Sequence, residues 1–262
     1  MTELPPAFFL SDGDQFQATA LCRGPWDPGS LHGGPVTALI GREAERADPD
    51  PALFTARLTV ELLRPVPLSR LRVDTSVLRP GKRVRILGVS VTHDGTEVAR
   101  ATVLRVQRVA SDLTEALPVG GVPFAPPEDA ETAPRLVEGY VGIMDGMDVR
   151  TVSGISTRRG PATYWFKLRA PLVDDEPVDP LSTALMAADF GNGISSVVPI
   201  ETHLFINPDL TVYLHRRPEG EWVANDAQTW QHPGAGSVAE ASLWDRAGQF
   251  GRATQSLFVA PR

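Results

Sequence analysis

The chain has 262 residues, of which 42% are hydrophobic and 22% are charged, and this suits one large domain or two domains of ordinary size. The formal net charge of −7 argues against a nucleic-acid partner. A single cysteine, Cys22, excludes a disulfide framework, and the five histidines lack the spacing of a metal site. The first residues lack the basic region of a signal peptide, and no apolar run approaches the roughly 18 residues that a membrane helix needs. We therefore expect a cytoplasmic protein with no metal, no nucleic acid and no membrane span.

The first half of the chain predicts a short strand, a helix and four longer strands. Residues 15–22 (QFQATALC) alternate enough to predict the short strand. The helix opens at Gly33-Gly34-Pro35 and runs to about Ala47, where Asp48-Pro49 ends it. Apolar and polar residues alternate from Leu71 to Val77, so that strand has one dry and one wet face. The four longer strands are Thr55–Leu63, Leu71–Leu78, Arg83–Thr92 and Thr96–Arg108, with Asp94-Gly95 as a hairpin turn before the last.

The second half predicts a similar plan after a linker. Ser111–Pro134 is poor in periodicity and rich in Pro, Ala and Glu, so we interpret it as a surface linker. The second helix, Leu181–Phe190, follows Asp179-Pro180 and is expected to stop at Gly191 and Gly193. The predicted strands are Met147–Ile155 and Ala162–Arg169 before this helix, and about Ser196–Phe205, Leu210–His215, Trp222–Gln231, Ser237–Asp245 and Phe250–Val259 after it.

Matching segments indicate that the two halves are copies of one unit. The pattern T-A-L-apolar-x-x-acid begins at Thr37 and again at Thr183, an offset of 146 residues. The dipeptide R-P precedes the tripeptide R-A-T by 36 residues from Arg64, and by 35 residues from Arg217. Such a repeat predicts a tandem architecture. One helix lying across a long antiparallel sheet, made twice, is an α+β fold, and the two sheets can pair edge to edge and so remove two open edges.

One carboxylate stands out on the second helix. The apolar residues at 181, 184, 185 and 188 recur with the spacing of an amphipathic helix. Asp189 stands on the same stripe, eight residues after Leu181. A carboxylate on a buried face is costly unless it is hydrogen-bonded or has a chemical role. Asp189 is therefore either a last-turn residue bonded to the GNG turn or a candidate functional acid.

The order and spacing of these segments resemble a double hotdog fold. From about Phe8 to Val259, the chain is similar to acyl-CoA thioesterases of the bacterial thioesterase II type. This resemblance implies an N-terminal hotdog repeat over residues 1–110, a linker over 111–135, and a C-terminal repeat over 136–262 that carries the active site. It also implies hydrolysis of an acyl-CoA thioester to free acid and CoA, as in fatty acid metabolism. Coenzyme A is then part of the substrate and no other cofactor is needed. We expect a homo-oligomer, a dimer of double hotdogs.

The resemblance assigns three polar residues of the second half to the attacking water. By matching motifs, the acid falls on Asp189 in AADFGN and the glutamine on Gln255 in ATQS. The middle position falls on Asn207, where the family has Thr or a similar side chain. Asp189 would act as general base, and the two amides would fix the water. We predict that the three side chains converge beside an apolar tunnel for the acyl chain.

The first half carries a related but altered motif. His32-Gly33-Gly34 resembles the H-G-G of single-hotdog thioesterases, in which an acid follows seven residues after the second glycine. This chain has Gly41 at that position and Glu43 two residues later. We therefore interpret the first half as a degenerate site or a wall, and His32 as a loop or cap residue.

Three further residues are candidates for binding the substrate. The backbone N–H groups of Gly33 and Gly34 can bind the thioester carbonyl, as helix N-termini do. Arg83, in the basic turn RPGKRVR, can contact the phosphates of coenzyme A.

Two other functions stay open from the sequence. A hotdog dehydratase or hydratase needs an Asp/His pair, and its signature G-D-x-N-P-x-H is absent. A non-catalytic protein that binds acyl groups or other ligands could keep the same fold. Release of free thiol from a panel of acyl-CoAs would separate the thioesterase from the binding protein.

Overall fold

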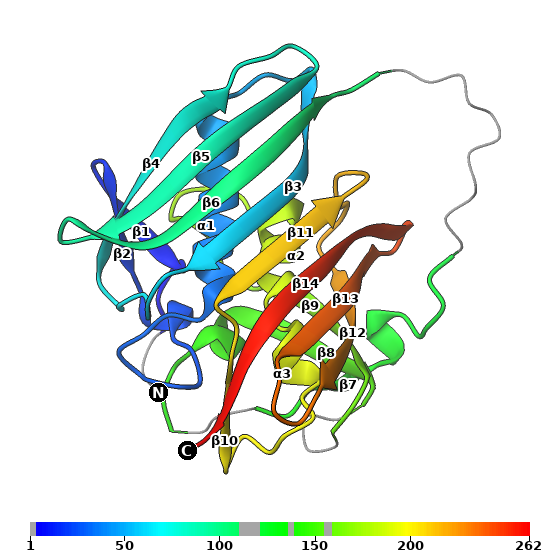
Figure 1. The fold of residues 1–262 in the computed structure, drawn as a ribbon. Helices are drawn as coiled ribbons and strands as arrows, with labels where there is room; N and C mark the ends of the chain where they lie inside the picture. Colours follow the sequence, from blue (N-terminus) through cyan, green and yellow to red (C-terminus); the bar gives the residue numbers. More distant parts are fainter. Residues whose placement is uncertain (1–3, 110–120, 136–138, 155–158) are drawn as a thin grey trace.

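Two helices lie against the inner face of one large antiparallel sheet that curves around them (Figure 1). The structure is a computed structural model that describes residues 4–109, 121–135, 139–154 and 159–262. Residues 111–120 of the predicted linker and the predicted strand end at Ile155 lie outside the described residues. None of the described helices has both the length and the hydropathy of a membrane span.

The described elements are strands interrupted by helices, of which α1 and α2 are the longest. Those of the first half are β1 (Phe9–Asp12), β2 (Gln15–Ala18), η1 (Ala20–Cys22), α1 (Gly33–Ala47), β3 (Leu53–Leu62), β4 (Arg70–Arg79), β5 (Val84–His93) and β6 (Thr96–Gln107). Those that follow up to the second long helix are η2 (Pro127–Asp129), β7 (Glu131–Thr132), η3 (Ile143–Gly146), β8 (Met147–Ser153), β9 (Ala162–Leu168) and α2 (Pro180–Ala188). The last are α3 (Gly191–Ile194), β10 (His203–Ile206), β11 (Asp209–Leu214), β12 (Val223–Gln231), β13 (Ser237–Asp245) and β14 (Gly248–Pro261).

The described strands form one 14-stranded sheet in which the two halves have corresponding strand orders. From the centre outward, the first half runs β3-β6-β5-β4-β2-β1 and the second runs β11-β14-β13-β12-β9-β8-β7, while β10 pairs with β14 off this path. The halves join where β3 and β11 pair antiparallel, with Val60 opposite Leu210. This joint removes two open edges, which would otherwise present unpaired backbone groups. The predicted α+β double hotdog, with its sheets paired edge to edge, is confirmed.

The strand register repeats between the halves as well. Thr102 of β6 lies opposite Thr59 of β3, and Thr254 of β14 lies opposite Thr211 of β11. The two R-A-T segments therefore occupy equivalent strands beside the central joint. The sequence echo reflects a common position in the fold.

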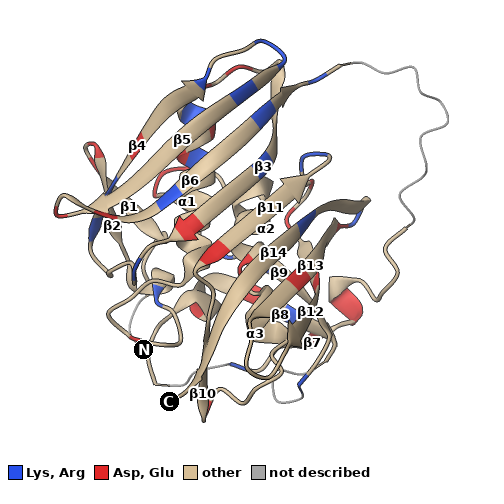
Figure 2. Cartoon of the chain, viewed as in Figure 1, with Lys and Arg blue, Asp and Glu red and all other residues tan. Residues whose placement is uncertain are grey.

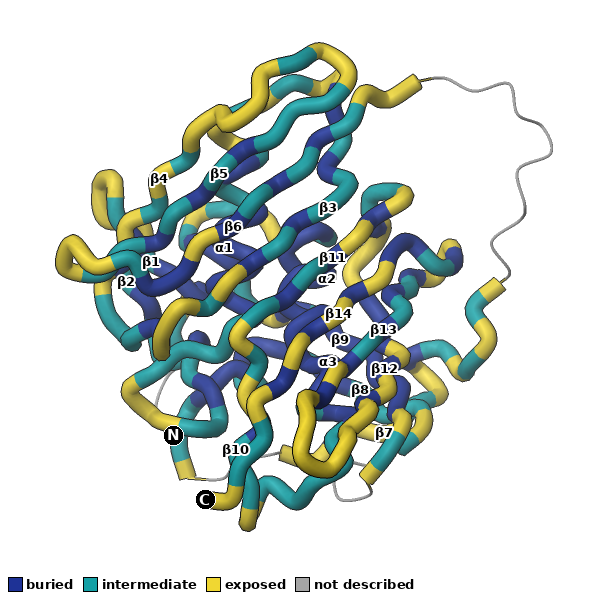
Figure 3. The backbone as a smooth tube through the Cα atoms, in the orientation of Figure 1, coloured by how far each residue is buried: buried dark blue, intermediate teal, exposed yellow. Residues whose placement is uncertain are grey.

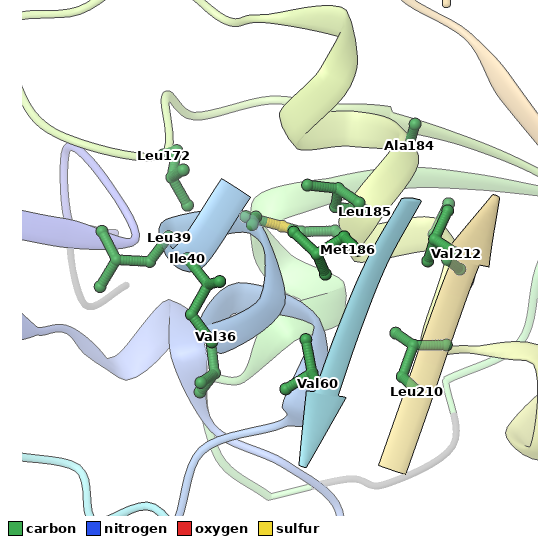
Figure 4. Packing of buried hydrophobic residues seen from close by; sticks show 14 of the residues in the cluster. Val36, Leu39, Ile40, Val60, Leu172, Ala184, Leu185, Met186, Leu210 and Val212 are labelled. Atoms are coloured by element: carbon green, nitrogen blue, oxygen red, sulfur yellow. The ribbon is translucent and has the colours of Figure 1, made fainter. Parts of the chain in front are cut away.

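The core lies between the two helices and the joint of the sheet. Figure 4 shows side chains of α1 (Ile40), α2 (Leu185, Met186), β3 (Val60) and β11 (Val212) gathered in one cluster, and all of them are buried. At Gly41 of α1 a Cβ atom would overlap Cδ1 of Leu185. Close helix approach therefore accounts for glycine at the position where the H-G-G pattern has an acid.

Helix α2 is enclosed on all sides, whereas the apolar stripe predicted an amphipathic helix. Every residue from Leu181 to Ala188 is buried, including the polar Ser182 and Thr183. Figure 3 shows the buried positions concentrated on the helices and alternating along the strands. Because α1 packs on one side of α2 and strands β9 and β12 pack on another, α2 has no wet face.

The segment after α2 differs from the prediction. Gly191 and Gly193 do not end the helix as predicted. Helix α2 already ends at Ala188, with Asp189 as its C-cap, and the two glycines belong to the short helix α3. The predicted strand Ser196–Phe205 is wrong except at its end, since β10 begins at His203. Before β10, the Ser196 hydroxyl bonds the backbone two residues on, which stabilises a local turn instead of a strand ladder.

Smaller differences occur near the outer edge of the first half. The strand predicted over residues 15–22 ends at Ala18, because the Thr19 side chain caps η1. The strand β1, which pairs with β2, was not predicted. The dry face predicted from Leu71 to Val77 does not reach its end, where Val77 is 54% exposed. A register shift between β4 and β5 at this point turns the strand away from the core.

Two loop predictions have clear outcomes. Asp94 and Gly95 have φ values of 47° and 74°, the left-handed pair that a tight hairpin turn needs, so this turn is confirmed. The described end of the predicted linker packs against the second half, where β7 pairs with β8 and the Trp165 indole donates to the carbonyl of Ala125 at 2.9 Å. The domain boundaries stay a prediction.

Candidate active site

A cavity of about 620 Å³ lies where the two halves meet. Its wall combines Trp26 and Leu62 of the first half with Phe205 and Phe258 of the second. Trp26 and Phe205 meet edge to face with their ring centroids 4.8 Å apart, so aromatic contact joins the halves across this wall. Asp189 lies in the same wall. The cavity thus offers a mainly apolar enclosure with a carboxylate at its surface.

Asp189 is 2% exposed and is held by amide side chains from two other elements. Asn207, between β10 and β11, donates from Nδ2 to Oδ1 of Asp189 at 2.8 Å. Gln255 of β14 donates from Nε2 to the same oxygen at 3.3 Å. A buried carboxylate needs such partners to offset the loss of water. The three side chains converge, with both amides bonding Oδ1 of Asp189 directly, whereas a water held by all three stays a prediction.

Gln255 acts as a bridge behind the carboxylate. Its Nε2 also donates to the backbone carbonyl of Asp189 at 3.1 Å, and its Oε1 accepts from the backbone N–H of Asn192 at 3.2 Å. Gln255 is 1% exposed and does not line the cavity, whereas Asn207 does. Gln255 therefore fixes Asp189 and the turn after it, and the cavity surface is left to Asp189 and Asn207. The repeat-equivalent residue on β6, next to Thr102, is Val103, which cannot form these bonds.

His32 completes the group from the first half of the chain. As N-cap of α1, it lies with Nδ1 at 2.8 Å from Oδ2 of Asp189 and 3.1 Å from the backbone N of Gly34. Its ring stacks on Phe190, with centroids 4.6 Å apart. One ring nitrogen cannot accept from Gly34 and donate to Asp189 at once. When Asp189 is ionised, the proton belongs on Nδ1, and the contact becomes a charge-assisted hydrogen bond.

The first turn of α1 presses against the same carboxylate. A Cβ atom at Gly33 would lie 2.7 Å from Oδ2 and 2.9 Å from Oδ1 of Asp189, so only glycine fits there. The N-terminus of a helix carries partial positive charge, which is favourable beside a carboxylate. Asp189 caps the C-terminus of α2, whose partial charge is negative. The first half therefore supplies the electrostatic partner that the acid's own helix lacks.

Family comparison agrees with this two-part organisation. The model of the acyl-CoA thioesterase N-terminal domain matches residues 22–106, and that of the C-terminal domain matches residues 121–259. The chain belongs to the acyl-CoA thioesterase family. A search of the curated proteins found no relative that matches this member of the family.

Solved structures of similar fold cover almost the whole of this thioesterase-family chain. A proposed thioesterase from Novosphingobium aromaticivorans is 20% identical, with a TM-score of 0.75 and coverage of 96% of this chain and 98% of that one. A hot dog fold protein of unknown function from Alicyclobacillus acidocaldarius is 19% identical, with a TM-score of 0.74 and coverage of 96% and 95%. The acyl-CoA thioesterase II TesB2 from Mycobacterium marinum is 18% identical, with a TM-score of 0.68 and coverage of 96% and 93%. At these identities the likeness supports the fold alone.

Some of the residues that the sequence predicted for the site line the cavity, and others lie outside it. Gly33 lines the cavity, but Gly34 does not, and its N–H points to His32. Arg83 lies in the turn between β4 and β5 and is not among the residues that line the cavity, so the structure does not bring it to Asp189. Glu43 pairs with Arg42 on α1 and does not line the cavity either.

His32 is the site residue that sequence reasoning underrated. The H-G-G motif is visible in the sequence, but a histidine before a helix is most simply a loop or cap residue, and no local pattern places Asp189 beside it. The signal that could have found it is the pair of glycines, which indicates that something approaches the start of α1 closely.

Proposed function

We propose that this chain hydrolyses acyl-CoA thioesters to free acid and CoA by direct attack of water, with Asp189 as general base. The observation that carries the proposal is the buried Asp189 carboxylate in the wall of an apolar cavity, oriented by His32, Asn207 and Gln255. Family membership supports the reaction class. The proposal needs no cofactor, because coenzyme A is part of the substrate. The homo-oligomeric state and the cytoplasmic location stay predictions.

In the proposed mechanism, the water occupies the cavity beside Asp189 and Asn207. Both side chains line the cavity, and so does His32. Asp189 accepts a proton as the water oxygen bonds to the thioester carbonyl carbon. The carbon–sulfur bond then breaks, and the proton passes from Asp189 to the leaving thiolate of CoA. The products are the free acid and the CoA thiol, and the enzyme returns to its starting state.

Each neighbour of the acid has a distinct part in this scheme. His32 and Gln255 hold the carboxylate in place, and its remaining lone pair is the acceptor for the proton of the water. The backbone N–H of Gly33 is the candidate donor to the negative charge that develops on the thioester oxygen. Gly34 does not line the cavity and is not assigned that part.

The test is turnover of a panel of acyl-CoAs by wild type and by Asp189→Asn, followed through release of free thiol. A general base contributes about 10²–10⁴-fold, so we expect Asp189→Asn to lower kcat about 100-fold or more. Glu43→Gln is the matched control, because Glu43 occupies the repeat-equivalent position yet does not line the cavity. It should retain wild-type turnover.

Two results would contradict the proposal. An Asp189→Asn variant with wild-type turnover would remove Asp189 from the mechanism. A wild-type protein that binds acyl-CoA saturably, with no thiol released from any substrate of the panel, would favour the non-catalytic binding protein.

A further inference from the structure

The two ends of the α1–α2 pair are related by the internal repeat, but their charges are arranged differently. At the end away from Asp189, Arg217 donates from Nη1 to both oxygens of Glu45, at 3.0 and 2.9 Å. Its Nη2 donates to both oxygens of Asp179, at 3.0 and 2.9 Å. The guanidinium of Arg217 is therefore fully committed to two carboxylates, one from each half of the chain.

The repeat-equivalent arginine at the cavity end is Arg64. Both arginines stand in the R-P dipeptide that follows the central strand of their half, β3 or β11. The helix offset of 146 residues relates Asp179 to Gly33 and Glu45 to Gly191. Both acids that hold Arg217 thus have glycine counterparts at the cavity end, so Arg64 lacks the carboxylates that its equivalent uses.

Arg64 is exposed and lines the cavity that contains Asp189. Among the described residues, no hydrogen bond, ion pair or cation–π contact involves its side chain. Two other arginines among the described residues line the cavity. Arg135 is bonded through both Nη atoms to Asp145 at 2.9 and 2.7 Å, and Arg159, from the second half, is exposed. Two further described acids line the cavity besides Asp189. Asp27 is committed to its own turn, through the backbone N–H of Gly29 at 2.9 Å, and Glu201 forms no ion pair with Arg64. Arg64 is therefore a cation without a protein anion at the edge of an apolar cavity.

A phosphate site on this protein has to depend on individual side chains. The formal net charge is −7, and Figure 2 shows basic bands on β5 and β6 mixed with acidic bands on β3 and β11 over the same face. A guanidinium presents paired N–H donors that match two phosphate oxygens. A ligand that fits both features has an apolar part for the cavity and a phosphate that stays near solvent.

We propose that Arg64 binds a phosphate group of the thiol carrier that delivers the acyl chain, in place of the carboxylates that bind Arg217. This proposal rests on the proposed thioesterase function. The phosphate can come from coenzyme A or from the phosphopantetheine of an acyl carrier protein, and the two differ in phosphates beyond the first. Arg64 is a specificity residue in this scheme, and it leaves the chemistry at Asp189 unchanged.

The test compares Arg64→Gln with wild type on three thioesters of the same acyl chain: acyl-CoA, acyl-phosphopantetheine and acyl-pantetheine, which lacks phosphate. We expect the KM for acyl-CoA to rise about ten-fold at unchanged kcat, as loss of one charge-assisted contact would give. The KM for acyl-pantetheine should not change. A rise for acyl-phosphopantetheine as well identifies the phosphate shared with acyl carrier protein, and a rise for acyl-CoA alone identifies the phosphates specific to CoA.

Arg83→Gln is the matched control, because Arg83 is also an exposed arginine and was the residue that the sequence nominated for CoA. It should leave all three KM values unchanged. Equal KM increases with all three thioesters for Arg64→Gln would mean that Arg64 shapes the cavity, and would overturn the proposal. So would unchanged KM values for Arg64→Gln, or an effect of Arg83→Gln in its place.

Binding of free CoA, measured by calorimetry, keeps this test separate from the proposed function. If wild type hydrolyses none of the three thioesters, the proposed function fails, and the dissociation constants decide the role of Arg64. A ten-fold weaker binding of CoA by Arg64→Gln, with wild-type binding by Arg83→Gln, supports the phosphate contact. Equal dissociation constants for Arg64→Gln and wild type contradict it.

Discussion

At the scale of single residues, the Asp189 carboxylate owes its environment to groups that lie far away in the sequence. His32 precedes it by 157 positions and Gln255 follows it by 66. Each of them contributes a side-chain nitrogen within 3.3 Å of a carboxylate oxygen. The geometry leaves Asn207, His32 and Asp189 at the cavity surface and keeps Gln255 behind them. The residues of this group therefore differ in function, because Gln255 does not reach the cavity and the other three do.

We predict that His32→Leu lowers kcat about 10- to 100-fold with little change in KM. The variant removes the donor at 2.8 Å from Asp189 Oδ2, and a hydrogen bond to a charged group contributes about 1.5–3 kcal/mol. His32→Asn should recover part of the loss, because its amide nitrogen can replace Nδ1 and asparagine is also a good helix cap. Steady-state kinetics and circular dichroism of both variants provide the measurement. If His32→Asn and His32→Leu lose activity equally, His32 does not act through this donor.

At the scale of elements, α1 and α2 pack so closely that the position of every group at their ends is fixed. Gly41 permits this approach, because a Cβ atom there would overlap the buried Leu185. The same antiparallel pair brings the N-terminus of α1 to the C-terminus of α2, where a Cβ atom at Gly33 would overlap the Asp189 carboxylate. The contact between α1 and α2 therefore sets both the helix packing and the electrostatic environment of Asp189.

We predict that Gly41→Val lowers the free energy of unfolding by about 1–3 kcal/mol, although valine has the higher helix propensity. Overpacking at the α1–α2 contact outweighs the propensity gain. The double variant Gly41→Val/Leu185→Ala should show coupling, since the shortened side chain makes room for the added methyl groups. Urea unfolding of wild type, the two single variants and the double variant completes a double-mutant cycle. Additive losses would show that the two positions do not share this contact.

At the scale of the whole molecule, the halves are held together by more than the β3–β11 joint. Arg42 of α1 donates from Nε to Glu176 of the second half at 2.8 Å, and Arg46 contacts the same carboxylate at 3.1 Å. Here the first half supplies the arginines, whereas at Glu45 of α1 the arginine is Arg217 of the second half. Ion pairs therefore fasten α1 to the second half near its C-terminal end, while His32 and Gly33 do so at its N-terminal end.

We predict that Glu176→Gln removes part of the loss of stability in acid. Hydrogen bonds from Arg42 lower the pKa of Glu176 below its usual value, and partial burial opposes them less strongly. A folded-state pKa below the unfolded value means that the pair stabilises the fold above about pH 4.3 and loses this contribution as the pH falls through the folded pKa. Urea unfolding at pH 7 and pH 3.5 should therefore differ less for Glu176→Gln than for wild type.

Glu240→Gln is the control for this measurement, because Glu240 pairs with Arg252 on the exposed face of a single half. It should retain the wild-type difference between the two pH values. The expected effect of Glu176→Gln is below about 1 kcal/mol, since the pair is partly exposed to water. An unchanged acid dependence would show that Arg42 and Glu176 do not stabilise the folded state.

The sequence by itself determined the two copies of one α+β unit, most of the long strands and the acid that the site is built around. These features rest on local signals: alternation along a strand, a hairpin turn such as Asp94-Gly95, and one carboxylate among apolar residues. The prediction from sequence was wrong after Asp189, where the chain forms the short helix α3. Contacts with side chains of β12 and β14 stabilise that helix, and local sequence does not show them.

Only the tertiary structure decided which residues share the site. Nothing near His32 in the sequence indicates a carboxylate 157 positions away, and nothing near Arg83 indicates that it lies outside the cavity wall. The difference between Arg64 and Arg217 likewise depends on acids that lie on other elements. Local sequence patterns record which face of an element is buried, whereas the partner of a charged group is set by how whole elements pack. That packing brings the positive end of α1 against Asp189, where the carboxylate's own helix offers no such support.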